Sequence, residues 1–231
     1  MSEKKRPSVN ELAPKVRTWV FDLDNTLYRV PPPMHAELDT RMRRFVSEFL
    51  GVDPETAYAI QKDYFRKYGL TLRGLMVNHG LDPRVYESHM GGGLDYSGLK
   101  PDRRLRDAIA ALEGRKVIYT NAFASHARLV LDLLALAEHF DAVYDIEAAG
   151  YRPKPEIESY RHLCDLHGID AERAAMVDDI PHNLEPAARM GMTTIWVRTG
   201  AAWDDDDAAG PHIHHQTHDI AGWLRRVASP C

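Results

Sequence analysis

The second half of the chain alternates short apolar runs with segments of helical periodicity, and this alternation constrains the fold more than any other feature. Strand-like runs occupy 116–121, 142–146, 174–179 and 193–198, after an earlier one at 16–23. Helical patterns lie between them at 103–114, 125–140, 154–168 and 183–191. Strands that alternate with helices form parallel sheets whose two faces are covered. We therefore predict an α/β core with a Rossmann-like parallel sheet flanked by helices.

A long stretch without strand-like runs separates the first strand from the others. Helical spacing of apolar residues recurs there, at 34–51, 53–69, 71–80 and 82–93. The first residues of the chain are polar and aperiodic. We therefore predict three parts: a core formed by 14–30 and 98–231, an all-helical insert at 31–97, and a flexible N-terminal tail at 1–13.

Composition and charge exclude several classes of function. The 231 residues carry a net charge of −5, so charge-driven binding of a nucleic-acid polymer is not expected. No apolar run follows the basic N-terminus as in a signal peptide, and no segment has the composition of a membrane span. Two cysteines, Cys164 and Cys231, do not make a disulfide framework, so we expect a cytoplasmic protein. Nothing in the sequence indicates the oligomeric state.

Polar residues gather where the predicted strands end. They are Asp22 and Asp24, Thr120 and Asn121, Lys154, and Asp178 and Asp179. Lys154 comes after the third strand, at the start of a predicted helix. In an open parallel sheet the carboxyl ends of the strands share the edge where ligands bind. We therefore expect these side chains to lie on one rim of the sheet.

These residue types suit the binding of a phosphoryl group. Gathered carboxylates need a cation, and oxygen ligands that leave room for water and phosphate favour Mg²⁺. Lys154 adds positive charge, while Thr120 and Asn121 supply hydroxyl and amide donors. One aspartate can attack phosphorus, and a second can protonate the leaving oxygen and later activate water. Asp22 and Asp24 are suited to these two tasks, because alternate residues of an extended segment point the same way.

The motifs also carry a family resemblance. DLDNT, TN, the lysine of PKPE, and DD, in this order and at strand ends, resemble the four motifs of the haloacid dehalogenase superfamily, whose members are mostly phosphatases. The resemblance covers the chain from about Val16 to Val197. It implies that the helical insert is a cap that opens and closes over the substrate, excludes water and sets specificity.

The resemblance implies a catalytic role for each strand-end residue. Asp22 resembles the nucleophile and Asp24 the general acid/base. Lys154 resembles the lysine that offsets the charge of nucleophile and phosphate. Thr120 resembles the phosphate donor, with Asn121 beside it.

The resemblance also implies a Mg²⁺ site. Asp179 resembles the direct metal ligand, together with the Asp22 carboxylate and the Asp24 main-chain carbonyl. Asp178 would be a further ligand or a partner of the ligands.

A finer resemblance concerns the substrate. YFRKYGLTLRGLM, LKPDRRLRDAIAAL and YTNAFASHA resemble the pyrimidine 5′-nucleotidase branch, which hydrolyses nucleoside monophosphates such as UMP and CMP. The match includes the cap, so Tyr68 and Arg73 are candidates for holding the base or ribose. One motif departs from the branch: DDIPHN stands where DDSxxN is common, so Asn183 is kept but a hydroxyl near the metal is missing.

Each candidate also has a purely structural interpretation. The aspartates, Thr120 and Asn121 could be turn or capping residues, and Lys154 a surface lysine. Other features we interpret structurally from the outset: the histidines alternate as in a strand, the aspartate run is typical of a solvated loop, and the cysteine suits core packing. These are His212, His214, His215 and His218; Asp204 to Asp207; and Cys164.

The sequence thus predicts a Mg²⁺-dependent phosphomonoester hydrolase that acts through an aspartyl-phosphate on a small molecule, with UMP and CMP as the expected substrates. A haloacid dehalogenase would share fold and nucleophile but needs neither Asp24 nor Mg²⁺. A phosphatase or mutase acting on a phosphosugar or another small metabolite would also fit the motifs, as would a non-catalytic phosphate-binding regulatory protein. The core motifs do not separate these functions, because many substrates share one fold.

Overall fold

Strands from both ends of the chain form one parallel sheet, in the order β3-β2-β1-β4-β5-β6. The computed structural model describes residues 12, 14–90, 93–200 and 210–229. The strands are β1 (Thr18–Phe21), β2 (Arg115–Tyr119), β3 (Ala142–Tyr144), β4 (Ala174–Asp178), β5 (Thr193–Val197) and β6 (His215–Thr217). β1 is central, with Thr18 opposite both Arg115 of β2 and Ala174 of β4. The predicted Rossmann-like α/β sheet is confirmed.

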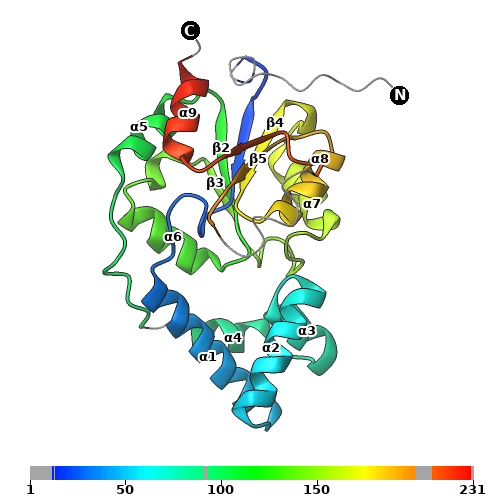
Figure 1. Cartoon of the computed structure of the whole chain (residues 1–231). Helices are drawn as coiled ribbons and strands as arrows, with labels where there is room; N and C mark the ends of the chain where they lie inside the picture. The colour runs from blue at the N-terminus through cyan, green and yellow to red at the C-terminus, as the bar shows by residue number, and fades with distance from the viewer. Residues whose placement is uncertain (1–11, 13, 91–92, 201–209, 230–231) are drawn as a thin grey trace.

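Helices cover both faces of the sheet. One face packs against α5 (Arg103–Ala111), α6 (Ala124–Leu133) and α9 (Ile220–Ala228), and the other against α7 (Ile157–His167) and α8 (Pro181–Arg189) (Figure 1). The short 3-10 helices η2 (Ala137–His139) and η3 (Ala171–Arg173) precede β3 and β4. Along β1, Trp19 and Phe21 point into the apolar cluster beneath α5, α6 and α9. Val20, between them, points into the apolar cluster beneath α7 and α8. Because both faces are buried, the strands are apolar on successive residues.

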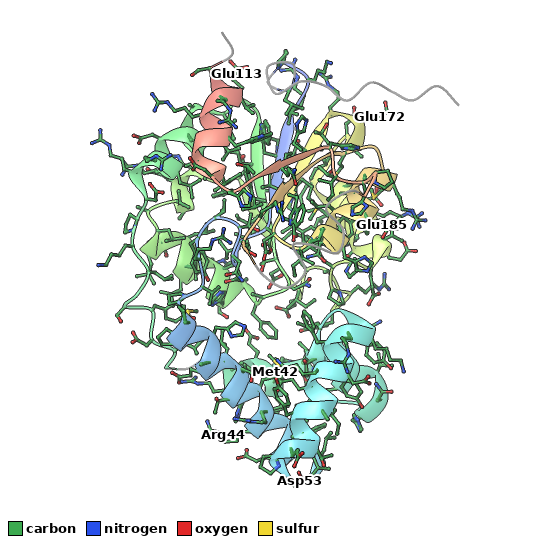
Figure 2. The ribbon with its side chains drawn as sticks, viewed as in Figure 1. Met42, Arg44, Asp53, Glu113, Glu172 and Glu185 are labelled. Carbon is green, nitrogen blue, oxygen red and sulfur yellow. The ribbon has the colours of Figure 1, made fainter. Side chains whose placement is uncertain are left out.

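A separate group of helices lies between β1 and β2 in the sequence. They are α1 (Pro32–Leu50), α2 (Pro54–Tyr68), α3 (Thr71–His79) and α4 (Pro83–Met90). They enclose an apolar cluster of their own that includes Phe45, Val46 and Leu72, with Met42 packed against it (Figure 2). Figure 1 shows them together at one end of the molecule. We propose that these helices are the inserted cap, and the name is kept for them below.

The cap lies at the carboxyl edge of the sheet. Glu113 and Glu172 come just before β2 and β4. In Figure 2 both lie at the end of the molecule away from the cap, whose outer tip carries Asp53. The carboxyl ends of the strands therefore point toward the cap.

The boundary of α7 and one residue of the predicted tail differ from expectation. α7 begins at Ile157 and not at Lys154, because a residue that precedes a proline is disfavoured in helical backbone. Leu12 was predicted in the flexible tail, but it is buried in the cluster beneath α5 and α9. The other residues of 1–13 lie outside the described part. Cys164 is buried against the sheet, as predicted.

Gly69 brings the cap into close contact with the core. It ends α2 with a φ of 73°, and a Cβ at this position would lie 2.6 Å from the carbonyl oxygen of Lys154. Gly80 ends α3 with a similar φ of 66°, but a Cβ there would meet nothing within 4 Å. The two glycines therefore share a backbone conformation and differ in their surroundings.

We expect Gly69→Ala to destabilise the protein more than Gly80→Ala. The left-handed conformation alone costs an alanine about 1–2 kcal/mol. Overpacking against Lys154 should add about 1–3 kcal/mol at position 69 only. Urea unfolding of both variants measures the difference. Equal losses would show that the cap moves away from Lys154 without resistance.

Candidate active site

The end of β1 carries the first pair of carboxylates. Asp22 directly follows the strand and is 7% exposed. Its N–H donates to the carbonyl oxygen of Val177 at 2.9 Å, which continues the pairing with β4. The chain then turns through Asn25, whose φ is 63°, and Thr26 donates its hydroxyl to Oδ2 of Asp22 at 2.7 Å. The turn therefore fixes one oxygen of the Asp22 carboxylate.

Lys154 is the centre of the site. Its side chain is 2% exposed, and Nζ lies 2.7 Å from Oδ1 of Asp22 and 2.7 Å from Oδ2 of Asp178. Nζ also donates to the carbonyl oxygen of Tyr119 at 3.0 Å. Burial lowers the pKa of Lys154, but the charges of Asp178 and Asp22 raise it by more than burial lowers it. The pKa of Lys154 therefore lies above its ordinary value. The lysine is thus a buried cation that links β1 with β4.

The Lys154 backbone is held by the end of β2. The side-chain oxygen of Asn121 accepts the Lys154 N–H at 2.8 Å, and its amide donates to the Lys154 carbonyl oxygen at 3.3 Å. The neighbouring Thr120 is buried and accepts the N–H of Ala122 at 3.0 Å, which uses its oxygen and not its hydroxyl hydrogen. The structure therefore brings Thr120, Asn121 and Lys154 together, and Asn121 positions the lysine.

β4 ends in the second pair of carboxylates. Oδ1 of Asp178 accepts the N–H of Ile180 at 2.9 Å and the side-chain amide of Asn183 at 3.0 Å, while Oδ2 faces Lys154. The backbone N–H of Ile180 thus holds Asp178 although this motif lacks the serine hydroxyl. The main-chain oxygen of Asp179 accepts the indole N–H of Trp196 at 3.0 Å.

Asp22, Asp178 and Asp179 form a buried acidic cluster. Each offers an oxygen within 4.8 Å of the others. Burial raises the pKa of Asp22 to about 7, against the influence of Lys154. Burial, with the charges of Asp22 and Asp178, raises the pKa of Asp179 to about 9. The cluster offers only oxygen ligands, which suit Mg²⁺. A bound divalent cation would also stabilise the ionised carboxylates, which burial alone disfavours.

Asp24 has neighbours that sequence reasoning missed. Tyr28 donates its hydroxyl to Oδ1, and Nε2 of His126 lies 2.9 Å from the same oxygen. Nδ1 of His126 lies 3.0 Å from the hydroxyl of Tyr96. Burial raises the pKa of Asp24, but the hydrogen bond and charge of His126 outweigh it, so the pKa is lowered. His126 lies in the first turn of α6, just after the end of β2, and that position is the signal that could have identified it.

The two cap candidates have different surroundings. Nε of Arg73 lies 3.5 Å from Oε1 of Glu156, beside the Lys154 segment. The hydroxyl of Tyr68 instead accepts the side-chain amide of Asn78 at 3.1 Å, within the cap. The structure therefore brings Arg73 to the core, while the hydroxyl of Tyr68 is engaged inside the cap.

The histidine segment lies at the edge of the sheet, beside β5. Nδ1 of His214 accepts the N–H of Thr194 at 3.0 Å, and β6 begins at His215. In the part of the chain that the structure describes, the acidic cluster is the only group of such side chains placed to hold an ion. The run Asp204 to Asp207 lies outside the described residues.

The strand-end geometry agrees with a known protein family. A family model described as haloacid dehalogenase-like hydrolase matches residues 16–191. The chain belongs to the haloacid dehalogenase-like hydrolase family. This match includes β1, the cap helices and the strands up to β4, so it contains every residue of the acidic cluster.

Relatives within this family include phosphatases. A 5′-nucleotidase of Pseudomonas aeruginosa is 33% identical, over 90% of this chain and 93% of its own length. Phosphate metabolism protein 8 of Saccharomyces cerevisiae is 28% identical over 80% of this chain, which spans only 63% of that protein's length. A phosphoglycolate phosphatase of Mesorhizobium japonicum is 26% identical over 78% of this chain. These matches bear out the prediction of a phosphatase of this family.

Solved structures agree on the fold. A HAD phosphatase from Thermococcus onnurineus has a TM-score of 0.57 at 18% identity, over 92% of this chain and 97% of its own. L-2-haloacid dehalogenases have the same fold at similar identity. Such likeness establishes the fold and not the reaction. In the described residues, no helix is both long and apolar enough to cross a membrane.

Without a divalent cation, we expect the protein to lose stability as the pH rises through 7 and 9. The folded pKa values of Asp22 and Asp179, about 7 and about 9, lie above the ordinary 3.8. The contribution of these two carboxyls to the free energy of unfolding is therefore complete below pH 3.8. It declines as the pH rises and is lost once the pH has passed their folded pKa values. Bound Mg²⁺ should remove this loss, raising Tm at pH 9 by roughly 5–10 °C at about 100 times the Kd.

Thermal unfolding from pH 6 to pH 9, with and without Mg²⁺, measures this effect. Asp179→Asn should reduce both the decline and the Mg²⁺ response. Asp63→Asn, which removes an exposed carboxylate on α2, is the control and should change neither. Identical Tm values with and without Mg²⁺ at pH 9 would contradict a cation site in the cluster.

Proposed function

We propose that this chain is a Mg²⁺-dependent phosphomonoester hydrolase that acts through an aspartyl-phosphate on Asp22, with pyrimidine nucleoside 5′-monophosphates such as UMP and CMP as substrates. The observation that carries the proposal is the Lys154 ammonium, held 2.7 Å from both Asp22 and Asp178 at the carboxyl edge of the sheet. A phosphoryl group brings negative charge to Asp22, and a buried cation beside it offsets that charge. The 33% identity to a 5′-nucleotidase supports nucleoside 5′-monophosphates as the substrate class, and the resemblance of the cap segment to the pyrimidine branch is the basis for UMP and CMP.

Asp22 would act as the nucleophile. Its hydrogen bonds with Lys154 and Thr26 orient the carboxylate and favour its ionised form. The Thr120 hydroxyl would donate to a phosphoryl oxygen, and the Lys154 ammonium, whose three hydrogens go to Asp22, Asp178 and Tyr119, would stabilise the phosphoryl group by its charge. An oxygen of Asp22 would form a bond to phosphorus while the ester bond breaks, and the electron pair of that bond would leave with the ester oxygen.

Asp24 would transfer the protons of the reaction. In the first step it would give a proton to the leaving oxygen. In the second it would take one from the water that attacks the acyl phosphate, which releases phosphate and restores Asp22. A haloacid dehalogenase does not need this group, so the presence of Asp24 favours the phosphatase.

Two carboxylates of the acidic cluster would bind the metal, and the third would position Lys154. Bound Mg²⁺ would supply further positive charge against the phosphoryl oxygens. The carboxylates of Asp22 and Asp179 and the main-chain carbonyl of Asp24 would hold it. Asp178 is fully buried and its two oxygens accept three hydrogen bonds, from Lys154, Ile180 and Asn183, whereas each oxygen of Asp22 accepts one, so we assign Asp178 to positioning the lysine.

We expect Mg²⁺-dependent phosphate release from UMP and CMP, in preference to AMP, GMP and phosphosugars. Asp22→Asn should lower the release by at least roughly 10³-fold, because the nucleophile is lost. Asp145→Asn is a matched control, since Asp145 is 6% exposed and accepts backbone N–H groups of Ala124 and Ala148 at the same edge. It should cost far less activity than Asp22→Asn.

The substrate panel separates the possible functions. Release only from other esters would retain the mechanism and reject the nucleotide substrate. Conversion of a phosphosugar into its isomer without net phosphate release would indicate a mutase. Binding of phosphate esters without turnover would indicate a regulatory protein.

Arg73 is the cap residue that we propose contacts the nucleotide. Its guanidinium lies beside Glu156, next to the Lys154 segment, and its side chain is 27% exposed.

Arg73→Gln should raise KM for UMP and CMP roughly tenfold, which corresponds to the loss of about one charged hydrogen bond. It should change KM for p-nitrophenyl phosphate much less. Arg66→Gln, at an exposed position of α2, is the control. Equal changes for all substrates would place Arg73 outside the nucleotide site.

A further inference from the structure

Both hydrogen bonds that the described residues give to the Asp24 carboxylate fall on one oxygen. Tyr28 donates its hydroxyl to Oδ1, and Nε2 of His126 lies 2.9 Å from the same atom. A carboxylate only accepts hydrogen bonds, so Nε2 carries a proton and donates it. Oδ2 is therefore the oxygen left for other chemistry.

His126 is itself held in place. Its side chain is 17% exposed, it belongs to the first turn of α6, and Nδ1 lies 3.0 Å from the hydroxyl of Tyr96. Tyr96 belongs to the segment that returns from the cap to the core. The imidazole is thus fixed at both nitrogens, between the cap linker and Asp24.

We propose that His126, oriented by Tyr96, is a positioning residue that determines which oxygen of Asp24 exchanges protons with the substrate. With Oδ1 occupied by two donors, a proton on the Asp24 carboxyl resides on Oδ2. From there it passes to the leaving oxygen as the bond between phosphorus and that oxygen breaks. This inference rests on the proposed function, in which Asp24 is the general acid.

The leaving group provides the test. Proton donation matters most when the leaving oxygen is a strong base, and little when the leaving group is an acidic phenol. Phenyl phosphate and p-nitrophenyl phosphate differ only by the nitro group, and UMP adds a more basic alkoxide. The constant to compare is kcat/KM, because it reports steps up to the release of the leaving group and not hydrolysis of the acyl phosphate.

For His126→Leu we expect kcat/KM for UMP and phenyl phosphate to fall roughly 10–100-fold, and that for p-nitrophenyl phosphate to fall less than about threefold. His126→Gln, which keeps an N–H donor, should recover part of the loss. Tyr96→Phe should show a smaller loss with the same dependence on the leaving group. His139→Leu is the matched control, since that imidazole is 18% exposed and lies outside the site; it should show no such dependence.

Two outcomes would overturn the inference while leaving the proposed function intact. One is an equal fall for all three esters, which indicates a structural role for His126. The other is no fall for any of them in the folded variants. If instead the wild-type protein hydrolyses none of the esters, or Asp22→Asn keeps its activity, the proposed function itself fails and this inference with it.

Discussion

The ammonium of Lys154 between the carboxylates of Asp22 and Asp178 is the interaction on which the arrangement of the site depends. A buried ion pair repays its desolvation only with good geometry, and apolar residues in its place are often as stable. Stability alone therefore does not explain why these charges are buried. The sheet order does explain how they meet: β1 lies between β2 and β4, so Asp22, Asp178 and the Tyr119 carbonyl surround one ammonium.

The cap meets the core at the segment that carries this lysine. Gly69 packs on the Lys154 carbonyl, and Arg73 pairs with Glu156 two residues further along. Asn121 holds the same segment from the side of the sheet. The position of the cap is therefore linked to the backbone of Lys154. Tyr96 makes a comparable link, through His126, from the returning linker to Asp24.

The sequence predicted the sheet, its flanking helices and the gathering of strand-end residues, because these depend on periodicity and on the rule that parallel strands share a carboxyl edge. It did not predict the partners of those residues. The position of His126 just after β2 places it at the carboxyl edge, but the sequence does not indicate that it meets Asp24 or that Tyr96 meets it. The start of α7 was predicted too early, at Lys154, because the restriction that Pro155 places on the residue before it was not taken into account. Leu12 lay in a polar, aperiodic context that concealed its burial.

The central place of β1 also bears on how the protein matures. β1 pairs with β2 and β4, whose first residues follow it at Arg115 and Ala174. A nascent chain therefore carries Asp22 long before the strands that align it, or Lys154 and Asp178, have been synthesised. Such non-local pairings form late, because the intervening loop must close first. The site is complete only when nearly the whole core is present, so an incomplete chain leaving the ribosome holds Asp22 without the residues that surround it in the folded protein.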